Sequence, residues 1–376
     1  MKILIIGGTG VLSTDILRRS TECAYDVSVL NRGNHNSQIQ GNVTIYKADI
    51  RNIAEVDASL GNAKFDVVVD FLSFNVNDLK ATFGYFRNRC KQYIYISSAC
   101  VFRRRAEDGI ILEDSPKPNR DLPYSVKKYE CEQWLLRNAK ETDCKYTVVR
   151  PYITYGDTRI PFGIAPAAGY HWTIVSRINC NKPMFLWDGG IARCTLMHSK
   201  DFAYNFVQLY LNDKAYNEDI NLVGDYVYSW RAMLEILYDI LGGDKNNIVS
   251  IPTEQIALIL PCYRDFLVGD RSLNAVFDNS KLKRCIPNFR QNIALREGMS
   301  ETLNYYASNS CLNGIDYGYD GRVDKLIERV CKCRLRFVDY LKSRSIRDKI
   351  SYYVNKHLSD SQLRGLHSAL NKLRFK

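Results

Sequence analysis

The chain contains a serine, a tyrosine and a lysine whose side chains could transfer the hydroxyl proton of an alcohol: Ser98, Tyr124 and Lys128. Tyrosine and lysine four residues apart share one face of a helix. An ammonium beside a phenol favours the phenolate and pulls the tyrosine pKa down from its usual value of about 10. We therefore interpret Tyr124 as a general acid/base for a carbinol proton, with Ser98 bonded to the same substrate oxygen.

The same tyrosine–lysine spacing occurs twice more in the chain, at Tyr210/Lys214 and at Tyr352/Lys356. Only the pair at Tyr124 lies between two expected strands of a sheet. It also follows Ser98, a hydroxyl at the end of an expected strand, where ligands bind in parallel sheets. Its position in the chain therefore selects Tyr124 and Lys128 as the catalytic pair.

A glycine-rich segment, residues 7–13, follows the first apolar run. Glycines between a strand and a helix allow a tight turn and a close approach of the backbone to a pyrophosphate, and the helix N-terminus supplies N–H donors. Ser13 replaces the third glycine of this pattern. The segment predicts binding of a dinucleotide.

The ends of the second and third expected strands carry the next candidates. Asn31 stands where NAD-binding folds usually place an acid for the ribose 2′-hydroxyl, and Arg32 follows it. An arginine can pair with a 2′-phosphate, so its presence here favours NADP over NAD. Asp49 is a candidate acceptor for the adenine amino group, or alternatively the N-cap of the helix that begins near Ile53.

Strands and helices alternate in the pattern of the first 150 residues. Apolar runs predict strands at 2–6, 26–30, 43–46, 66–71, 92–97 and 145–149, and helical spacing predicts helices at 11–19, 53–60, 78–89 and 123–140. Continuous Val/Ile runs between helices indicate a parallel sheet covered on both faces. Right-handed crossovers then give an α/β, doubly wound Rossmann sheet. Residues 199–212 and 229–242 are also expected to be helical.

The basic character of the chain comes from its C-terminal end. The net charge of the chain is +11, with 52 Lys/Arg against 41 Asp/Glu. Residues 321–376 hold 15 Lys/Arg and 5 Asp/Glu, whereas residues 1–320 hold 37 Lys/Arg and 36 Asp/Glu. The body is therefore nearly neutral. Helical apolar spacing in the basic segment predicts a surface that docks on the body of the protein or on another subunit, or that lies on an anionic membrane; nucleic acid is not expected.

Twelve cysteines are scattered along the chain without the spacing of a metal site. The apolar start is cut short by glycines, so no signal peptide is expected, and no apolar stretch is long enough to span a membrane. We therefore predict a cytoplasmic protein with reduced thiols and no metal.

Several segments together resemble the extended short-chain dehydrogenase/reductases, the NAD-dependent epimerase/dehydratase group. They are GGTGVLS (7–13), KAD (47–49), SSACVF (97–102), YSVKK (124–128), RPYITYGD (150–157) and DNSKLKR (278–284). The resemblance implies a Rossmann domain at 1–155, with 195–228 returning to it, and a smaller substrate domain at 156–194 and 229–310. A basic helical extension at 311–376 exceeds what the family fold needs.

The resemblance also implies roles for individual residues. Ser98, Tyr124 and Lys128 would be the catalytic triad, and Arg193 and Arg271 would bind the substrate diphosphate. Cofactor contacts are expected from Gly7, Thr9, Gly10, Val11, Leu12, Asn31, Arg32, Asp49, Ile50, Phe71, Leu72, Ser73, Tyr124, Lys128, Pro151 and Ile153. Cys100 and His171 match acid/base positions of the family member GDP-fucose synthase, although we favour the simpler interpretation, in which Cys100 is a packing residue and His171 a loop hydrogen-bonder.

These features predict an epimerase that acts on a nucleotide-activated sugar by transient oxidation, at sugar C4, as a homodimer. Ser98-Ala99-Cys100 replaces the Thr-Asp-Glu run of the 4,6-dehydratases, which disfavours dehydration. An NADPH-dependent reductase of a nucleotide-linked keto-sugar is the alternative enzyme. A third reading is a non-catalytic RNA- or partner-binding protein, because Asn31-Arg32-Gly33 resembles the chloroplast stem-loop-binding relatives.

Overall fold

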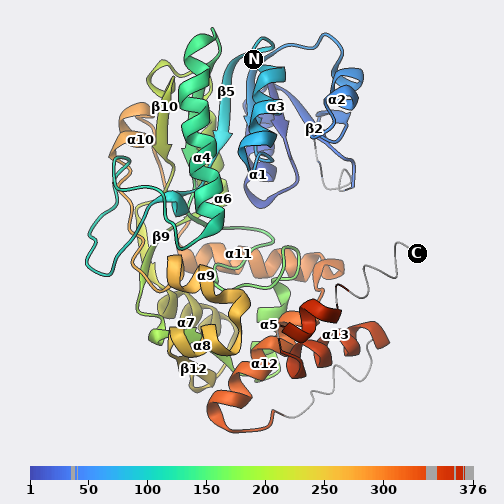
Figure 1. Cartoon of the computed structure of the whole chain (residues 1–376), viewed down its shortest axis with the longest axis vertical. Helices are drawn as coiled ribbons and strands as arrows, with labels where there is room; N and C mark the ends of the chain where they lie inside the picture. The colour runs from blue at the N-terminus through green and yellow to red at the C-terminus, as the bar shows by residue number, and fades with distance from the viewer. Residues whose placement is uncertain (35–38, 40, 336–344, 360, 367, 369–376) are drawn as a thin grey trace. The chain divides into compact units, whose positions relative to one another are not determined.

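The computed structural model describes residues 1–34, 39, 41–335, 345–359, 361–366 and 368. The chain divides into two units (Figure 1). Unit 1 comprises Met1–Gly156, Cys194–Val227 and Asn274–Ala294, and unit 2 comprises Asp157–Arg193, Tyr228–Leu273 and Leu295–Lys376. The sequence analysis assigned 274–294 to the substrate domain, whereas its contacts lie within unit 1.

A seven-stranded parallel sheet forms the centre of unit 1, in the order β10-β6-β5-β4-β1-β2-β3. The strands are β1 (Lys2–Ile6), β2 (Asp26–Asn31), β3 (Thr44–Lys47), β4 (Phe65–Asp70), β5 (Cys90–Ile96), β6 (Lys145–Arg150) and β10 (Glu218–Asn221). The strand order reverses between β1 and β4. The carboxyl ends of these two strands therefore form the topological switch point, where ligands bind in such sheets.

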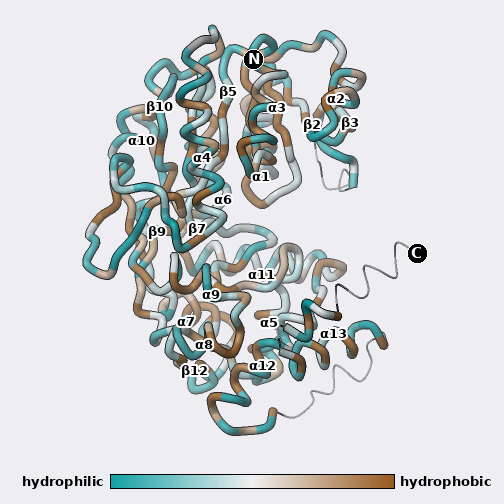
Figure 2. The backbone as a smooth tube through the Cα atoms, viewed as in Figure 1, coloured by the Kyte–Doolittle hydropathy of each residue, from teal (hydrophilic) through white to brown (hydrophobic). Residues whose placement is uncertain are grey.

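Helices cover both faces of this sheet, which confirms the predicted doubly wound fold. One apolar cluster joins α1 (Val11–Glu22), α6 (Ser199–Phe206) and α10 (Ser280–Cys285) to the sheet. The other cluster joins α2 (Ile53–Leu60), α3 (Val76–Phe86) and α4 (Pro123–Asn138). Ile3 and Ile5 belong to the first cluster and Leu4 and Ile6 to the second, which explains why the strands are apolar without alternation. Figure 2 shows α4 with mixed hydrophilic and hydrophobic residues, as expected of a helix that packs through one face.

Smaller elements complete the two units. A three-stranded sheet has the order β11-β9-β7, with β7 at Ile153–Tyr155, β9 at Arg193–His198 and β11 at Tyr226–Ser229. In unit 2, β8 (Met184–Trp187) pairs in parallel with β12 (Ile248–Ile251). The helices of unit 2 are α5 (Trp172–Asn179), α7 (Trp230–Leu241), α8 (Thr253–Ile259), α9 (Arg264–Phe266), α11 (Leu295–Ser308), α12 (Tyr317–Cys331) and α13 (Ile346–His357).

A buried ion cluster in unit 2 joins α12 to α5 and its following turn. Arg177 and Lys182 each pair with both Asp320 and Asp324. Tyr352 of α13 donates a hydrogen bond to Asp324 at 2.5 Å. The basic extension therefore begins with helices whose inner faces make buried contacts in unit 2.

The predicted helix over 199–212 is too long. α6 ends at Phe206, a tight turn covers Val207–Leu209, and Tyr210 is extended. Gln92 of β5 donates to the Leu209 carbonyl at 3.0 Å and accepts from the Leu211 N–H at 2.6 Å. These long-range bonds use backbone groups that a continuing helix would need. Among the described helices, none combines the length and the hydropathy of a membrane span.

Candidate active site

The glycine-rich turn between β1 and α1 has no room for side chains at two positions. A Cβ on Gly7, whose φ is +89°, would lie 2.8 Å from Cγ of Leu72, and a Cβ on Gly8 would lie 2.8 Å from Cγ1 of Val29. Ser13, which departs from the glycine pattern, accepts the Gly10 N–H with its Oγ at 2.8 Å. Because the first N–H groups of a helix lack intrahelical acceptors, this turn suits a phosphate.

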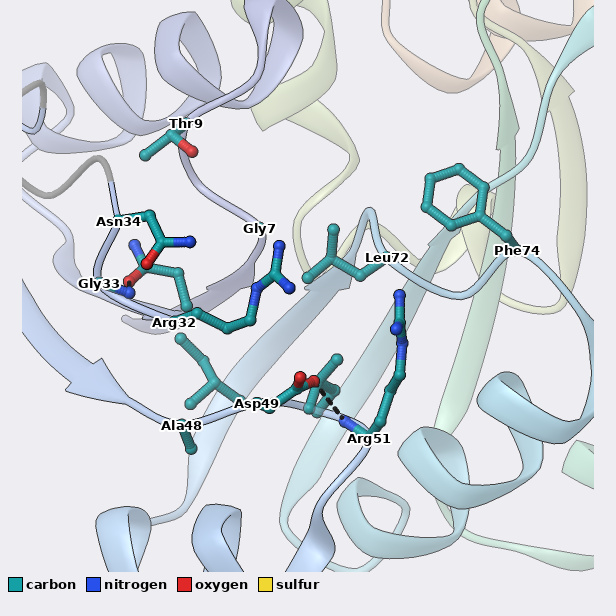
Figure 3. Close-up of a pocket in the computed structure, with 13 residues that line it drawn as sticks. Gly7, Thr9, Arg32, Gly33, Asn34, Ala48, Asp49, Arg51, Leu72 and Phe74 are labelled. Atoms are coloured by element: carbon teal, nitrogen blue, oxygen red, sulfur yellow. Dashed lines mark hydrogen bonds between the residues drawn. The ribbon is translucent and has the colours of Figure 1, made fainter. Parts of the chain in front are cut away.

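A cavity of about 170 Å³ lies at the carboxyl ends of β1, β2 and β3 (Figure 3). The residues that line it are Gly7, Thr9, Leu30, Asn31, Arg32, Gly33, Asn34, Ala48, Asp49, Ile50, Arg51, Leu72 and Phe74. The structure thus brings together the predicted cofactor residues Gly7, Thr9, Asn31, Arg32, Asp49, Ile50 and Leu72. The cavity lies where a Rossmann fold holds the adenosine part of a dinucleotide.

Asn31 has a polar atom that suits a ligand in this cavity. Its Oδ1 accepts the Gly33 N–H at 2.8 Å. Its Nδ2 is buried and has no hydrogen-bond partner among the described residues. A buried donor without a partner is costly, and a ribose or phosphate oxygen would satisfy it. The residues present therefore fit a nicotinamide dinucleotide.

Two arginines point into the cavity in Figure 3. They are Arg32 and Arg51. Arg32 was predicted to bind the cofactor, whereas Arg51 was not, although the predicted residue Asp49 is only two positions before it. Asp49 accepts the Arg51 N–H at 3.1 Å and is not the N-cap of α2. That cap is Asn52, whose side chain accepts the Glu55 N–H. The capping alternative for Asp49 is therefore wrong, and its contact with adenine stays a prediction.

The other predicted cofactor residues lie outside the lining of this cavity. Gly10, Val11 and Leu12 begin α1, Phe71 and Ser73 follow β4, and Pro151 and Ile153 follow β6. All of these positions are at the carboxyl edge of the sheet. Their contacts with a cofactor stay predictions.

Ser98 and Tyr124 meet at the carboxyl end of β5. Tyr124 is the second residue of α4, and its hydroxyl is hydrogen-bonded to Ser98. Burial raises the pKa of Tyr124 above its usual value, the nearby Cys100 adds to this, and the bond to Ser98 opposes it. The expectation that Lys128 lowers this pKa is wrong, because burial raises it and the ammonium is bonded to the carbonyls of Ser73 and Ile96. Tyr124 is held as a neutral phenol.

Lys128 lies beneath this pair and is almost fully buried, with 2% of its surface exposed. Its Nζ donates to the carbonyls of Ser73 and Ile96, both at 2.9 Å. The ammonium also lies 4.7 Å from the Phe74 ring centre and 4.8 Å from that of Tyr95. Burial lowers the pKa of Lys128 to about 8. The lysine therefore connects β4, β5 and α4 at the switch edge of the sheet.

Glu132 continues the helical face of Tyr124 and Lys128, at spacings of four residues. Its carboxylate accepts the Ser97 hydroxyl at 2.5 Å and two N–H groups of Arg150 at 2.7 and 2.8 Å. Arg150 also pairs with Asp219 at 2.5 Å. Glu132 thus attaches α4 to the ends of β5 and β6. Glu132 was not predicted from the sequence, although its spacing of four residues from Lys128 is a signal that indicates it.

Cys100 and His171 belong to different units. Cys100 is buried, and its N–H donates to Oγ of Ser98 at 3.2 Å. His171 precedes α5, and its Nδ1 accepts the Ile160 N–H at 3.2 Å. Burial, followed by the charge of Arg159, lowers the pKa of His171 to about 4. The neutral imidazole is thus an acceptor in a loop contact, and an acid/base role for either residue stays a prediction.

Unit 2 brings two cations together. Arg271, which was predicted to bind substrate, pairs with Asp270, donates to the Gly163 carbonyl at 3.2 Å and lies over the Trp230 ring. Burial, and then the neighbouring charge of Arg271, lowers the pKa of Arg159. Arg159 was missed by the sequence analysis. Arg193, the other predicted substrate residue, is exposed at the start of β9.

The parallel sheet, the glycine-rich turn and the cavity at the strand ends are typical of a dinucleotide-binding α/β enzyme. A sequence model of the NAD dependent epimerase/dehydratase family matches residues 3–223, more than half of the chain. The chain belongs to this family. It is accordingly an NAD(P)-dependent enzyme of the extended short-chain dehydrogenase/reductase type, and its cofactor is a nicotinamide dinucleotide.

Similar proteins of known sequence span several activities. The chain is 22% identical to a 2′-dehydrokanamycin reductase of Streptomyces kanamyceticus, over 77% of this chain and 80% of the reductase. It is 26% identical to the chloroplast stem-loop binding protein of 41 kDa b of Arabidopsis thaliana, over 60% of this chain and 59% of that protein. A UDP-glucose 4-epimerase of Lactobacillus helveticus is 25% identical, over 42% of this chain and 52% of the epimerase.

Solved structures share the fold at low identity. A UDP-glucose 4-epimerase of Thermotoga maritima has a TM-score of 0.67 and 19% identity, covering 82% of this chain and all of that one. A dTDP-glucose 4,6-dehydratase of Bacillus anthracis, solved with NAD, has a TM-score of 0.67 and 17% identity, covering 82% and 97%. These similarities confirm the predicted fold class.

Proposed function

We propose that this enzyme epimerises a nucleotide-activated sugar at C4 through transient oxidation and reduction. The observation that carries the proposal is the hydrogen bond between Tyr124 and Ser98 at the carboxyl end of β5, with Lys128 buried beside it. The similarity to UDP-glucose 4-epimerases supports the same reaction class. Nucleotide-activated sugars are the substrate class we propose.

Tyr124 carries the proton in this scheme. Its oxygen takes the proton of the sugar hydroxyl as that carbon is oxidised to a ketone, and returns it when the ketone is reduced. Ser98 donates a hydrogen bond to the same sugar oxygen and so holds it in position. The residues that line the cavity at the ends of β1, β2 and β3 would hold the nicotinamide dinucleotide, which would supply reversible hydride transfer at the sugar carbon and, in its oxidised form, would favour the phenolate of Tyr124. Lys128 orients the cofactor ribose with its ammonium.

NADP is the cofactor that we propose, with NAD as the alternative. Arg32 and Arg51 both point into the adenosine cavity (Figure 3). The last residue of β2 is the neutral Asn31 and not a carboxylate. Guanidinium groups pair well with a phosphate. Replacing Arg32 with Ala should weaken NADP about tenfold and leave NAD nearly unchanged. Equal losses for both dinucleotides would contradict the preference, and Arg51→Ala tests the second arginine in the same titration.

Arg159 and Arg271 are proposed to bind the substrate diphosphate from unit 2. Two positively charged guanidinium groups repel one another, and a diphosphate anion bound between them would relieve this repulsion. Arg193 is the third candidate of this site. The measurement is the KM for UDP-glucose in Arg159→Ala and Arg271→Ala, compared with Arg231→Ala as a control, because the Arg231 guanidinium already pairs with Glu235.

The first experiment is mass spectrometry of the nucleotide released when freshly purified protein is denatured. A stoichiometric, tightly held dinucleotide supports an epimerase, whose cofactor is regenerated within one cycle, and its mass distinguishes NADP from NAD. The second experiment incubates the enzyme with UDP-glucose, dTDP-glucose and GDP-mannose and measures inversion at C4. Inversion of none of them, with a tightly held dinucleotide, would contradict the C4 assignment.

An NADPH-dependent reductase of a nucleotide-linked keto-sugar is the second candidate. The similarity to 2′-dehydrokanamycin reductase covers more of both chains than the similarity to the Lactobacillus epimerase. A reductase releases its oxidised cofactor after each turnover. An empty or readily exchanging cofactor site, with oxidation of NADPH in the presence of a keto-sugar, would select this candidate.

A non-catalytic RNA- or partner-binding protein is the candidate from another class, and the similarity to the chloroplast stem-loop binding protein favours testing it. Tyr124→Phe separates the two classes. The substitution should abolish turnover in an enzyme and leave binding of RNA or of a partner intact in a scaffold protein. The retained Tyr124/Lys128 pair favours the enzyme.

The outer face of α13 is proposed to lie on an anionic membrane surface. Ile346, Ile350 and Tyr353 are spaced along this face and are 78%, 56% and 44% exposed, and the segment 321–376 carries the excess of basic residues. Apolar side chains flanked by cations bind such surfaces. Vesicles with phosphatidylglycerol should sediment the protein and neutral vesicles should not, and Ile350→Glu should remove the binding. Equal binding to both would contradict the proposal.

Two further expectations of the sequence analysis stay predictions. The homodimer is tested by light scattering of the purified chain at several concentrations. A membrane-independent pool in the cytoplasm is tested by fractionating cells that express the protein.

A further inference from the structure

A pair of cysteines lies at the edge of the sheet opposite to the cofactor cavity. Cys90 is the first residue of β5, and Cys144 immediately precedes β6. Their Sγ atoms are 3.6 Å apart, and both thiols are free. Cys90 is half-buried, whereas only 2% of Cys144 is exposed. The proposed epimerase chemistry uses neither residue.

The backbone geometry permits a bond between these thiols. In the parallel register of β5 and β6, Gln92 is opposite Lys145. Cys144 is therefore beside Lys91, one residue along the strand from Cys90. Regular strand spacing would put the two Cα atoms about 6 Å apart, a separation that a disulfide can span, and the Sγ–Sγ distance shows that both side chains lie on the same side at these strand ends. The two sulfurs, 3.6 Å apart, must approach to about 2 Å for the bond to form.

A cation-lined cavity of about 270 Å³ adjoins Cys90. Its lining includes Lys2, Lys64, Arg89 and Lys91, with Asp66 as the only acid, so its charged side chains sum to +3. Asp66 is already paired with Lys91 at 2.8 Å. Basic surroundings attract anions, whereas the bond to Cys144 and then burial raise the pKa of the Cys90 thiol. The half-buried thiol therefore lies next to a site suited to a small, negatively charged reagent.

We propose that Cys90 and Cys144 form a reversible thiol–disulfide site that reacts with an anionic low-molecular-weight disulfide entering this cavity. The thiolate sulfur of Cys90 attacks one sulfur of the reagent, the reagent's S–S bond breaks, and one thiol leaves with the proton of Cys90. The sulfur of Cys144 then attacks Cys90, and the second reagent thiol leaves with the proton of Cys144. Two protein thiols are oxidised to one disulfide, and one small disulfide is reduced to two thiols.

The test uses the full chain and oxidised glutathione as the reagent. The expected product is a cross-linked peptide that contains Cys90 and Cys144, formed with the loss of two hydrogens and reversed by dithiothreitol. The midpoint of thermal unfolding should rise on oxidation, because the bond closes a long loop. The absence of this cross-link under conditions in which the exposed Cys180 reacts would overturn the proposal.

Single variants resolve the two steps. Cys144→Ser should accumulate a stable mixed disulfide on Cys90, whereas Cys90→Ser should leave the buried Cys144 unmodified. Modification of Cys144 in the second variant would overturn the order of the steps. Neither variant should change cofactor binding, since both cysteines lie at the opposite edge of the sheet, so this test is independent of the proposed epimerase activity.

The role of the cavity has its own control. Lys64→Glu should slow the reaction with oxidised glutathione about threefold or more at low ionic strength. The same variant should not slow the reaction with cystamine, a disulfide that carries amines. Equal rates of wild type and variant with oxidised glutathione would overturn the cavity as the route of entry.

Discussion

Two tyrosine–lysine pairs with the same spacing lie in opposite surroundings. On α4, the hydroxyl of Tyr124 is bonded to Ser98, and Lys128 donates to two backbone carbonyls. On α13, Lys356 donates to the hydroxyl of Tyr352 at 3.4 Å, and this hydroxyl donates to Asp324 at 2.5 Å. The second pair is thus the one in which lysine and tyrosine actually touch.

The comparison teaches that contact within the pair is not what identifies a catalytic tyrosine. Tyr352 donates its proton to a carboxylate that is buried in an ion cluster, and burial with the charge of Asp324 raises its pKa well above the usual value. Its hydroxyl is already used in holding α13 to α12. The partner of Tyr124 is a serine at a strand end, beside the crevice of the sheet, and such a hydrogen bond can be exchanged for one to a substrate.

The largest expected effect separates the two pairs directly. Tyr124→Phe should lower kcat by about 10²- to 10⁴-fold, because the proposed acid/base is lost, and should change stability little. Tyr352→Phe should leave kcat unchanged and lower the free energy of unfolding by about 1.5 to 3 kcal/mol, because a hydrogen bond to a charged group is lost. Steady-state kinetics and urea unfolding of both variants check this. A fall in kcat for the Tyr352 variant would contradict the view that Tyr352 is structural and Tyr124 catalytic.

Asp324→Asn tests the surroundings of the second pair. The substitution leaves Arg177 and Lys182, both buried, with one carboxylate fewer. An uncompensated buried charge costs about 3 to 5 kcal/mol, so the free energy of unfolding should fall by that order. Urea unfolding measures the loss, and kcat per folded molecule serves as the control. An unchanged unfolding midpoint would mean that Asp320 alone balances both cations.

The pH dependence of stability tests the first pair. Burial lowers the pKa of Lys128 to about 8 from 10.5, so between these values the unfolded chain binds more protons than the folded one. Stability therefore rises with pH across this window, by about 2 to 3 kcal/mol from this residue. The difference between wild type and Lys128→Met, in unfolding experiments from pH 8 to pH 10.5, isolates it. Parallel curves for the two proteins would contradict the buried ammonium.

The smallest effect is expected for Lys356→Met. This lysine pairs with Glu328 at 2.8 Å near the surface, with 10% and 21% of the two side chains exposed. Partly exposed pairs contribute about 0.2 to 1 kcal/mol, so a loss of that size and no change in kcat are expected.

Lys128→Met should instead weaken cofactor binding, whereas Lys127→Met, on the exposed side of α4, should not. Dinucleotide titrations of these two variants sharpen the comparison.

Much of unit 1 could be predicted, because its signals are local. Apolar runs such as 66–71 and helical spacing such as 123–140 gave the strands and helices to within a few residues. The predicted helix over 199–212 failed at Phe206, because Gln92, distant in sequence, binds the backbone that follows. Element ends depend on such long-range bonds and are therefore the least predictable.

Within the candidate site, the sequence by itself determined which residues have the chemistry: the spacing of Tyr124 and Lys128, a serine at a strand end and glycines after the first strand are local patterns. Only the tertiary structure decided their states. Burial keeps Tyr124 a neutral phenol, Lys128 is bonded to the carbonyls of Ser73 and Ile96, and Glu132 joins α4 to Arg150. Residue types and their spacing are properties of the sequence alone. Burial and hydrogen-bond partners arise only when distant segments pack together, and burial and hydrogen bonding determine the pKa values.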